Sequence, residues 1–325
     1  MTSLAKILIP IQSDVEELER VMLGLLDSQV PFVKSVAEYV IQNGGKRLRP
    51  LLTLLCARMS GFQGLAAFKM GSCIEFIHTA SLLHDDVIDN AQIRRGRASA
   101  NNKWGNHVSV LVGDFFYCRA SQLLTEQNNW KILKTVTDAI TALTEGEVLE
   151  ITTNADYHTS KDDYIKIIEN KTAVLFAAAC QVGGVLGNVS EEFELALRNY
   201  GFNLGVAFQL ADDVLDYTSS EDVFGKQNGI DLQEGKLTLP LITALQNAAP
   251  EEAKIIRTAL TSKHVEPAQV KEVADMIRKY KGFDVTWNLA KTYIETAKKS
   301  IEPFRNGIEK DILQAVANYV LARNF

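Results

Sequence analysis

The placement of proline constrains the fold of this chain more than any other feature of its sequence. Seven of the 325 residues are proline, and none lies between Leu51 and Leu239. A sheet-rich protein of this length needs many turns, and turns commonly contain proline. Apolar residues also recur at helical spacing, in the stripes 15–25, 270–280 and 289–301. The sequence therefore predicts an all-α fold in which long antiparallel helices pack around a shared core.

The composition is that of a soluble globular enzyme built as one domain. Hydrophobic residues make up 46% and charged residues 23%, and no low-complexity linker divides residues 1–325. The net charge of −6 excludes a global basic field, so we expect no nucleic-acid partner. The four cysteines form no CxxC pair, which is typical of buried thiols in a reducing compartment.

Neither of two apolar segments of the sequence predicts a membrane protein. The apolar run Leu4–Ile11 is short and is followed by acidic residues, unlike a targeting segment. The best candidate for a transmembrane span, Thr172–Ser190, carries polar residues and three glycines and is weakly apolar. We expect it to be a buried helix of a cytoplasmic protein that has no transmembrane segment and contacts membranes transiently, when product is released.

Two stretches of the sequence resemble each other, and each ends in three aspartates. Residues 76–89 and 202–216 are apolar helical stretches that finish in the pattern Asp-Asp-x-x-Asp. Carboxylates four residues apart share a helix face, about 5–6 Å apart at Cβ, and destabilise the helix unless a cation offsets them. Carboxylate oxygens bind Mg²⁺ together with waters and phosphate oxygens. We therefore predict a Mg²⁺ site for a diphosphate, with the ligands Asp85, Asp86, Asp89, Asp212, Asp213 and Asp216.

Basic residues accompany both aspartate clusters. In Gly44-Gly-Lys-Arg-Leu-Arg-Pro50, a glycine pair leads into Lys46 and Arg49, which can clamp a phosphate. Further cations lie in glycine-containing loops that follow the clusters, namely Arg94, Arg95 and Arg97 after the first and Lys226 and Lys236 after the second. Cations grouped in this way predict a site for two diphosphates.

Together these motifs resemble those of the trans-prenyl diphosphate synthases, also called the polyprenyl synthetase family. The likeness covers Gly44 to Pro240 and includes Arg94-Arg-Gly96, Gly113-Asp114, Lys171-Thr172, Phe208-Gln209 and Gly225–Lys236. It implies the isoprenoid synthase fold, with helices around a central cavity, and a homodimer. It also implies a Mg²⁺-dependent prenyltransferase that adds isopentenyl diphosphate to an allylic primer, farnesyl diphosphate, to make a long all-trans chain for a quinone.

The resemblance also assigns roles to individual residues. By this resemblance, Asp85 and Asp89 bind the metal on the allylic diphosphate, and Asp212 and Asp216 complete the metal cluster from a facing helix. Residues around the allylic substrate are Arg94, Lys171, Thr172, Gln209, Lys226 and Lys236, whereas Lys46, Arg49, His78 and Arg95 hold isopentenyl diphosphate. Asp85, Asp89, Lys171, Gln209 and Asp212 are the expected catalytic residues. His78 lies two helical turns before Asp85, on the same side of the helix, and His84 is expected to be structural.

Small residues before the first cluster predict a long product. Ser81 and Ala80 lie one turn before Asp85, so neither blocks a tail that runs along this helix toward its N-terminus. Ile77 and Ile74 lie about two and three turns back and are the next candidates to limit the chain. Eight isoprene units is the product that the resemblance favours, with heptaprenyl or solanesyl diphosphate as alternatives.

Three other functions were compared with this interpretation. A class I terpene cyclase would not need the Gly44–Pro50 clamp or a second Asp-Asp-x-x-Asp cluster. A metal phosphohydrolase suggested by His84-Asp85 needs more histidine ligands than the five histidines of the chain provide. A non-catalytic subunit of a heteromeric synthase would be expected to lack aspartates or clamp residues, and here both sets are intact.

Overall fold

Helices make up most of the part of the chain that the structure, a computed structural model, describes: residues 3–218, 229–262 and 264–323. The first half contains α1 (Leu4–Leu8), a 3₁₀ turn (Ile9–Ile11), α2 (Gln12–Gly24), α3 (Pro31–Gln42), α4 (Leu48–Met59), α5 (Leu65–Ile88), β1 (Ile93–Arg94), β2 (Arg97–Ala98), α6 (Ala100–Trp104), α7 (Asn106–Gln127) and α8 (Trp130–Thr153). The second half contains α9 (Lys161–Ile168), a π-helical turn (Glu169–Ala173), α10 (Val174–Leu186), α11 (Glu191–Thr218), α13 (Ile230–Gln233), α14 (Leu239–Asn247), α15 (Pro250–Leu260), α16 (Pro267–Lys279), α17 (Gly282–Ser300) and α18 (Ile308–Ala322).

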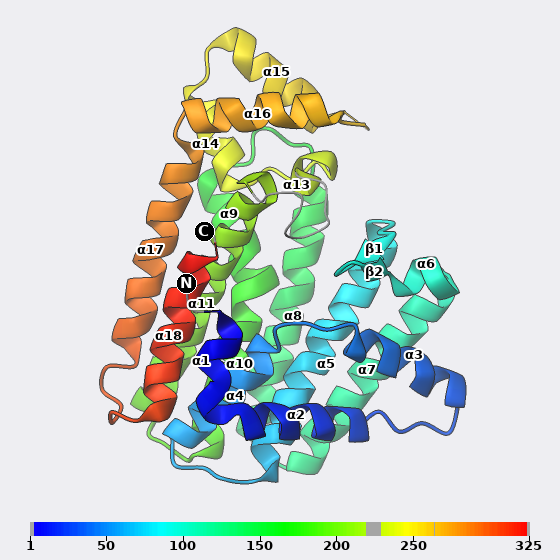
Figure 1. Cartoon of the computed structure of the whole chain (residues 1–325), viewed down its shortest axis with the longest axis vertical. Coiled ribbons are helices and arrows are strands. Elements are labelled where there is room, and N and C mark those ends of the chain that lie inside the picture. The colour runs from blue at the N-terminus through cyan, green and yellow to red at the C-terminus, as the bar shows by residue number, and fades with distance from the viewer. Residues whose placement is uncertain (1–2, 219–228, 263, 324–325) are drawn as a thin grey trace.

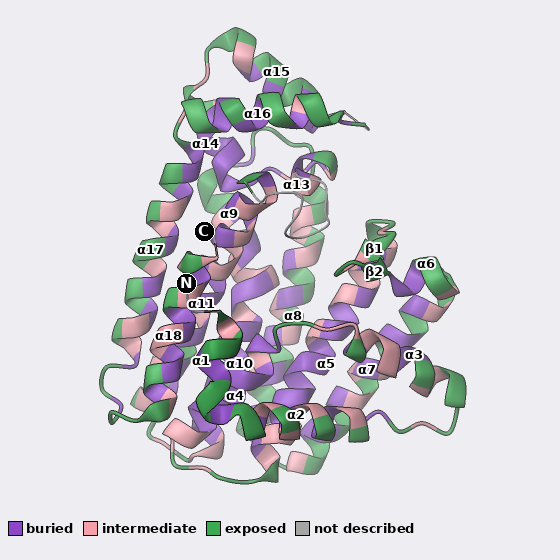
Figure 2. Ribbon diagram, viewed as in Figure 1, coloured by how far each residue is buried: buried purple, intermediate pink, exposed green. Residues whose placement is uncertain are grey.

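Helix α10 lies in the middle of the bundle (Figure 1). It packs along α4, α8 and α11, while α11 also packs along α17 and α5 packs along α7. Buried residues follow the inner faces of these helices (Figure 2), and Phe76, Phe116, Phe176 and Tyr200 are among the largest fully buried side chains. The small helices α13–α16 cap one end of the bundle, and α1 packs against α18, so the first and last described helices lie side by side.

The all-α prediction is confirmed. The three apolar stripes fall on α2, α16 and α17 and face the core. The stretch Thr172–Ser190 forms the end of the π turn and the buried helix α10, as expected. Within the described ranges, no helix combines the length and the apolar character that a membrane crossing requires. The sequence did not predict the short β1–β2 hairpin, in which Arg94 pairs with Arg97.

Candidate active site

The first aspartate cluster lies at the carboxyl end of α5. Asp85 is in the last turn, and the backbone N–H of Asp89 caps the helix by donating to the Asp85 carbonyl at 2.8 Å. Burial, followed by the nearby charge of Glu147, raises the pKa of Asp85 to about 7, and burial also raises the pKa of Asp89. Neither carboxylate has a hydrogen-bond or ion-pair partner among the described residues. Negative charge at the negative end of a helix dipole favours binding of a cation here.

Asp86 is engaged differently from its two neighbours. Its side chain is buried and accepts a 2.8 Å hydrogen bond from Nε of Arg94, on β1. Asn101 donates to the Asp86 carbonyl at 2.9 Å. Successive helical residues point about 100° apart, so Asp85 and Asp86 cannot face the same way. Asp86 therefore fixes the hairpin that carries Arg94 and Arg95.

The second cluster is in the last turns of α11, and its three carboxylates also have different partners. Asp212 accepts a 2.7 Å hydrogen bond from Arg323, which follows α18. Asp213 is buried and accepts hydrogen bonds from Tyr164 and, at 2.8 Å, from Gln209. Burial raises the pKa of Asp213 to about 7 despite these two donors. Asp216 accepts the backbone N–H groups of residues 230 and 231, both at 3.1 Å, and so holds the start of α13.

Two lysines near the first cluster are paired with glutamates. Lys171, in the π turn, contacts Glu147 at 2.7 Å and Glu150 at 2.6 Å. Lys236 contacts Glu234 at 2.7 Å and Glu150 at 3.8 Å. Burial opposes both positive charges, but the surrounding carboxylates outweigh it and raise the pKa of each lysine. Both lysines also lower the pKa of Asp89, so they lie within electrostatic reach of the first cluster.

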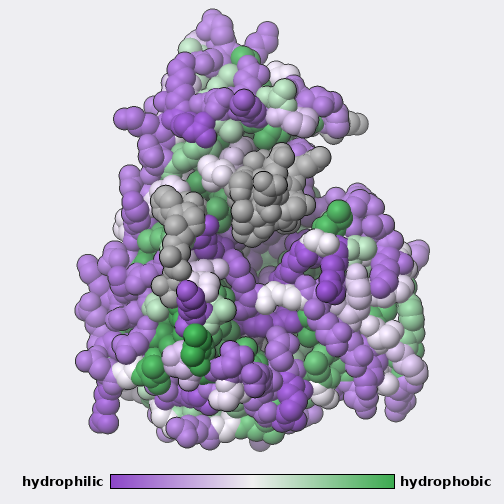
Figure 3. Space-filling view, in the orientation of Figure 1, coloured by the Kyte–Doolittle hydropathy of each residue, from purple (hydrophilic) through white to green (hydrophobic). Residues whose placement is uncertain are grey.

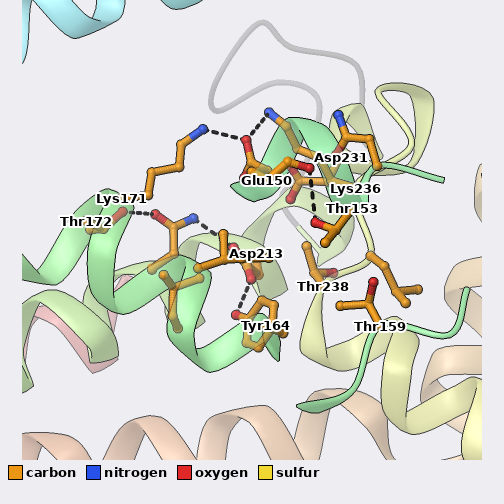
Figure 4. Close-up of a pocket in the computed structure, with 15 residues that line it drawn as sticks. Glu150, Thr153, Thr159, Tyr164, Lys171, Thr172, Asp213, Asp231, Lys236 and Thr238 are labelled. Atoms are coloured by element: carbon orange, nitrogen blue, oxygen red, sulfur yellow. Dashed lines mark hydrogen bonds and ion pairs between the residues drawn. The ribbon is translucent and has the colours of Figure 1, made fainter. Parts of the chain in front are cut away.

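A polar cavity of about 90 Å³ lies beside these lysines (Figure 4). A chain of hydrogen bonds runs along one side of it: Thr172 donates to Gln209 at 2.9 Å, Gln209 donates to Asp213, and Tyr164 donates to the same carboxylate. The amide dipole of Gln209 is thereby fixed in one orientation. Figure 3 shows a hollow in this face of the molecule, near its middle and lined largely by hydrophilic residues.

The π turn that carries Lys171 depends on a glycine of α8. A Cβ atom on Gly146 would lie 2.6 Å from the backbone nitrogen of Lys171. Gly205 of α11 allows a similar approach, since its Cβ would lie 2.7 Å from Cα of Ala173. Single π turns inside helices frequently occur at functional sites. The two glycines let the neighbouring helices hold this turn closely.

Cations without carboxylate partners form the other half of the site. Arg49 is half-buried and stacks on the ring of Phe176, 4.3 Å from its centroid, and its Nε is buried with no hydrogen-bond partner. Burial lowers the pKa of Arg49 to about 10. Lys46 lies 5.6 Å from the ring centroid of Tyr319, and among the described residues neither cation has a carboxylate within ion-pair distance.

Arg95 completes this cation cluster, and His78 lies beside it. Arg95 donates to the carbonyl of Gly44 and lies so close to the loop that a Cβ on Gly45 would be 2.5 Å from its Nη1. Burial, followed by the charges of Arg49 and Arg95, lowers the pKa of His78 well below its usual value. Like charges held together in this way, partly out of water, favour binding of an anion.

The remaining predicted residues are those expected to limit chain length, together with His84 and Lys226. Ala80, Ile77 and Ile74 are fully buried and Ser81 is 7% exposed, so all four lie inside the bundle. The hydroxyl of Ser81 donates to the carbonyl of His78 at 2.9 Å. His84 contacts the carbonyl of Val110 at 3.2 Å, which agrees with a structural role. Lys226 lies outside the described residues.

Sequence reasoning missed four groups that contact the predicted residues: Glu147, Glu150, Tyr164 and Arg323. The two glutamates are three residues apart on α8 and follow Gly146, and this pattern was available in the sequence. Nothing in the sequence relates Tyr164 or Arg323 to the second cluster. Their contacts result from the packing of α9 and α18 near α11.

The described residues alone do not enclose a metal ion. Across the described ranges, no three His, Cys, Asp or Glu side chains are grouped closely enough to enclose an ion. Mg²⁺ commonly binds through one or two carboxylates and completes its shell with water and substrate phosphate oxygens. The unpaired carboxylates of Asp85 and Asp89 fit this mode of binding.

Comparison with known proteins identifies the family of this chain. A family model described as Polyprenyl synthetase matches residues 30–277. The chain belongs to the polyprenyl synthetase family. It is 41% identical to octaprenyl diphosphate synthase of Haemophilus influenzae over 312 residues, which cover 96% of this chain and 94% of that protein. It is 44% identical to the Escherichia coli octaprenyl diphosphate synthase over 247 residues, 76% of each chain.

A solved structure agrees with these relatives across the whole chain. Polyprenyl synthase from Caulobacter crescentus, complexed with calcium and isoprenyl diphosphate, superposes with a TM-score of 0.94 at 38% identity, covering 100% of this chain and 99% of that one. Family membership confirms the predicted resemblance, the isoprenoid synthase fold and the class of activity, a long-chain all-trans prenyltransferase of isoprenoid biosynthesis. It excludes the terpene cyclase and the phosphohydrolase.

Proposed function

We propose that this protein extends farnesyl diphosphate with isopentenyl diphosphate to octaprenyl diphosphate, the precursor of a quinone side chain, in a Mg²⁺-dependent reaction. The observation that carries the proposal is the division of the site into two halves of opposite charge. The unpaired carboxylates of Asp85 and Asp89 form one half, and Lys46, Arg49 and Arg95, with His78 beside them, form the other. The first half fits a metal-bound diphosphate, and the second fits a diphosphate bound directly by cations.

Asp85, Asp89, Asp212 and Asp216 are the proposed metal ligands. Asp86 and Asp213, which the sequence also predicts as ligands, are bound instead by Arg94 in the first case and by Tyr164 with Gln209 in the second. When bound, Mg²⁺ would offset the charge that develops on the leaving diphosphate. A hard cation also relieves the repulsion between Asp85 and Glu147.

The chain's own residues bind and orient the two substrates. Lys171 and Lys236, together with Arg94 and Lys226, hold the allylic diphosphate and stabilise its departure, which leaves a delocalised allylic cation. To do so, the two described lysines must leave Glu147, Glu150 and Glu234. The oriented amide of Gln209 and the hydroxyl of Thr172 present neutral dipoles to the cation. Arg49, Lys46, Arg95 and His78 place the isopentenyl double bond for attack, and the released diphosphate accepts the proton that the product loses.

We further propose that the protein acts as a homodimer. α7 and α8 are consecutive helices that both expose large apolar side chains, with Leu111 67%, Val148 55% and Ile151 48% exposed. Exposed apolar residues on neighbouring helices suit a self-complementary interface. Sedimentation equilibrium of the purified protein measures the mass, and a monomer at micromolar concentration would contradict the proposal.

The central experiment incubates the purified chain with Mg²⁺, farnesyl diphosphate and isopentenyl diphosphate and identifies products by mass spectrometry. Octaprenyl diphosphate is expected, and seven-unit or nine-unit products would correct the chain length. Activity of the isolated chain also excludes a non-catalytic subunit. Arg49→Ala should raise the KM for isopentenyl diphosphate more than the KM for the allylic substrate, whereas Arg20→Ala, at an exposed site on α2, should change neither. Equal effects on both substrates would contradict the assignment of the cation cluster.

A further inference from the structure

Arg47 lies between Lys46 and Arg49 in sequence, but unlike them it binds carboxylates among the described residues. Its side chain is 6% exposed and is bound on three sides. Nε donates to Glu19 of α2 at 2.7 Å, Nη1 donates to Glu75 of α5 at 2.9 Å, and Nη2 donates to the carbonyl of Ile41 in α3. These bonds use three of the five N–H donors of the guanidinium, and because the side chain is buried little of it is open to a substrate.

The backbone at Arg47 is in a conformation that needs an anchor. Arg47 has φ +46° and ψ +32°, in the left-handed region that side chains other than glycine rarely adopt, at the residue before α4. Such a conformation persists where the surrounding structure holds it. This turn directly follows Lys46, and Arg49 is the second residue of the helix that begins after it. The conformation of Arg47 therefore sets the directions in which both cations point.

Glu75 also supplies charge behind the cation cluster. It lies three residues before His78 on α5, and its carboxylate is 4% exposed. It raises the pKa of Arg49 and of Arg95, in both cases against a larger lowering by burial. With Glu19 it gives the Arg47 group a net negative charge, which opposes the mutual repulsion of the cations when no diphosphate is bound.

We propose that Arg47, held by Glu75 and Glu19, is a positioning residue for the diphosphate of isopentenyl diphosphate. It binds no substrate itself, and it fixes the turn from which Lys46 and Arg49 reach that diphosphate. The inference rests on the proposed function, since it names which of the two substrates depends on Arg47. A purely structural role, in which Arg47 merely attaches α2 to the bundle, is the alternative.

The chain contains a matched control for that alternative. Arg58 of α4 binds Asp14, so it also attaches α2 through a partly buried arginine–carboxylate pair. Arg58 lies in the last turn of α4, at the opposite end from Lys46 and Arg49. Replacing either arginine by methionine removes the charge and keeps much of the apolar length of the side chain.

The experiment compares Arg47→Met, Arg47→Lys and Arg58→Met by steady-state kinetics and thermal unfolding. Arg47→Met should raise the KM for isopentenyl diphosphate at least about tenfold, with kcat and the KM for farnesyl diphosphate changed less than about threefold. Arg47→Lys should lie between Arg47→Met and the wild type. Arg58→Met should lower the unfolding temperature and leave both KM values unchanged. Unchanged KM values in a folded Arg47→Met enzyme, or equal changes in both arginine variants, would overturn the proposal.

Two further measurements keep the test decisive. If Arg47→Met does not fold, Glu19→Gln takes its place, because Glu19 is 38% exposed and its replacement disturbs the fold less. A selective rise in the KM for isopentenyl diphosphate in Glu19→Gln supports the proposal, and the absence of such a rise overturns it. If the wild type makes no polyprenyl product, the proposed function fails, and calorimetric titration with inorganic pyrophosphate then tests Arg47 separately. Weaker binding by Arg47→Met than by Arg58→Met supports positioning, and equal binding overturns it.

Discussion

The guanidinium of Arg323 donates to Asp212 at 2.7 Å and to the carbonyl of Phe208 at 3.2 Å, and it lies 4.2 Å from the centroid of the Phe208 ring. The residue after α18 therefore fixes the first carboxylate of the second aspartate cluster. Burial, followed by the charge of Arg323, lowers the pKa of Lys46, and the charge of Asp212 acts in the opposite direction. These three charges connect the metal-binding half of the proposed site to its diphosphate-binding half.

Replacing Arg323 by methionine should lower turnover by about tenfold or more while the fold persists. The substitution leaves Asp212 without its partner, and removing one member of a partly buried charge pair typically costs about 2–5 kcal/mol of the interaction. Initial rates at saturating substrates measure the effect, with Arg278→Met in an exposed ion pair as the control. Wild-type turnover in Arg323→Met would show that Asp212 needs no such support.

Asp85→Asn and Asp212→Asn should each lower turnover at least about a hundredfold, since groups that stabilise charge in the transition state typically contribute this much. Both substitutions keep the size of the side chain and remove its charge. Asp138→Asn, on the exposed surface of α8, serves as the control. Turnover of folded variants and of the wild type in excess EDTA measures the metal dependence. Near-normal rates in Asp85→Asn, or full activity in EDTA, would contradict the metal mechanism.

The same Asp85→Asn substitution should stabilise the metal-free protein at high pH. The pKa of Asp85 is about 7 in the folded protein against 3.8 for an exposed aspartate, because the site is buried and Glu147 is close. The folded state therefore keeps a proton that the unfolded chain releases, so the stability conferred by this group is present below about pH 4 and lost as pH rises to about 7. Discounted for partial exposure, the loss is about 1–2 kcal/mol.

Thermal unfolding in EDTA tests this expectation. Asp85→Asn should unfold at a higher temperature than the wild type at pH 8, and the difference should shrink as pH falls toward 4. Comparing the two proteins at each pH cancels the contributions of the other titrating groups. A difference that stays constant with pH would mean that the substitution acts through packing instead of charge.

The helices could be predicted from the sequence because helix periodicity and the absence of proline are local properties. α5 and α11 end within two residues of the last aspartate of each cluster, as the repeated pattern indicated. What the sequence did not reveal is which carboxylate faces the site. The 100° step between successive helical residues already separates Asp85 from Asp86, but the partners of Asp86 depend on how the hairpin folds back.

Contacts between residues far apart in the sequence account for the other features that the sequence did not predict. Glu147 and Glu150 look like a solvated helix face until the π turn brings Lys171 beside them. Arg47 stands between the two predicted clamp residues, and only the packing of α2, α3 and α5 shows that its side chain is buried against Glu19, Glu75 and the carbonyl of Ile41. Basic residues next to each other in sequence can therefore have different partners: Arg47 binds two carboxylates, and Lys46 binds none among the described residues.

Product length offers a test of where the growing chain lies. With its diphosphate at Asp85 and Asp89, the tail is expected to follow α5 toward Ile74, some 16 Å away at about 1.5 Å per residue. Ala80 and Ser81 are small and buried one turn behind Asp85, so an aromatic side chain there should close the path. Ser81→Phe, or Ala80→Tyr, should shorten the product to about three or four isoprene units while condensation continues, because helix geometry places the plug one turn from the diphosphate.

Mass spectrometry of the products of both variants decides this prediction, with Ser81→Ala as the control that removes the hydroxyl without adding bulk. The control matters because the hydroxyl of Ser81 bonds to the carbonyl of His78, and losing that bond must be separated from filling the path. Ser81→Ala should keep the wild-type length. If active Ser81→Phe and Ala80→Tyr enzymes both made the wild-type product, the tail would have to leave α5 before it reached Ser81 and Ala80. The two small residues would then serve the close packing of helices instead.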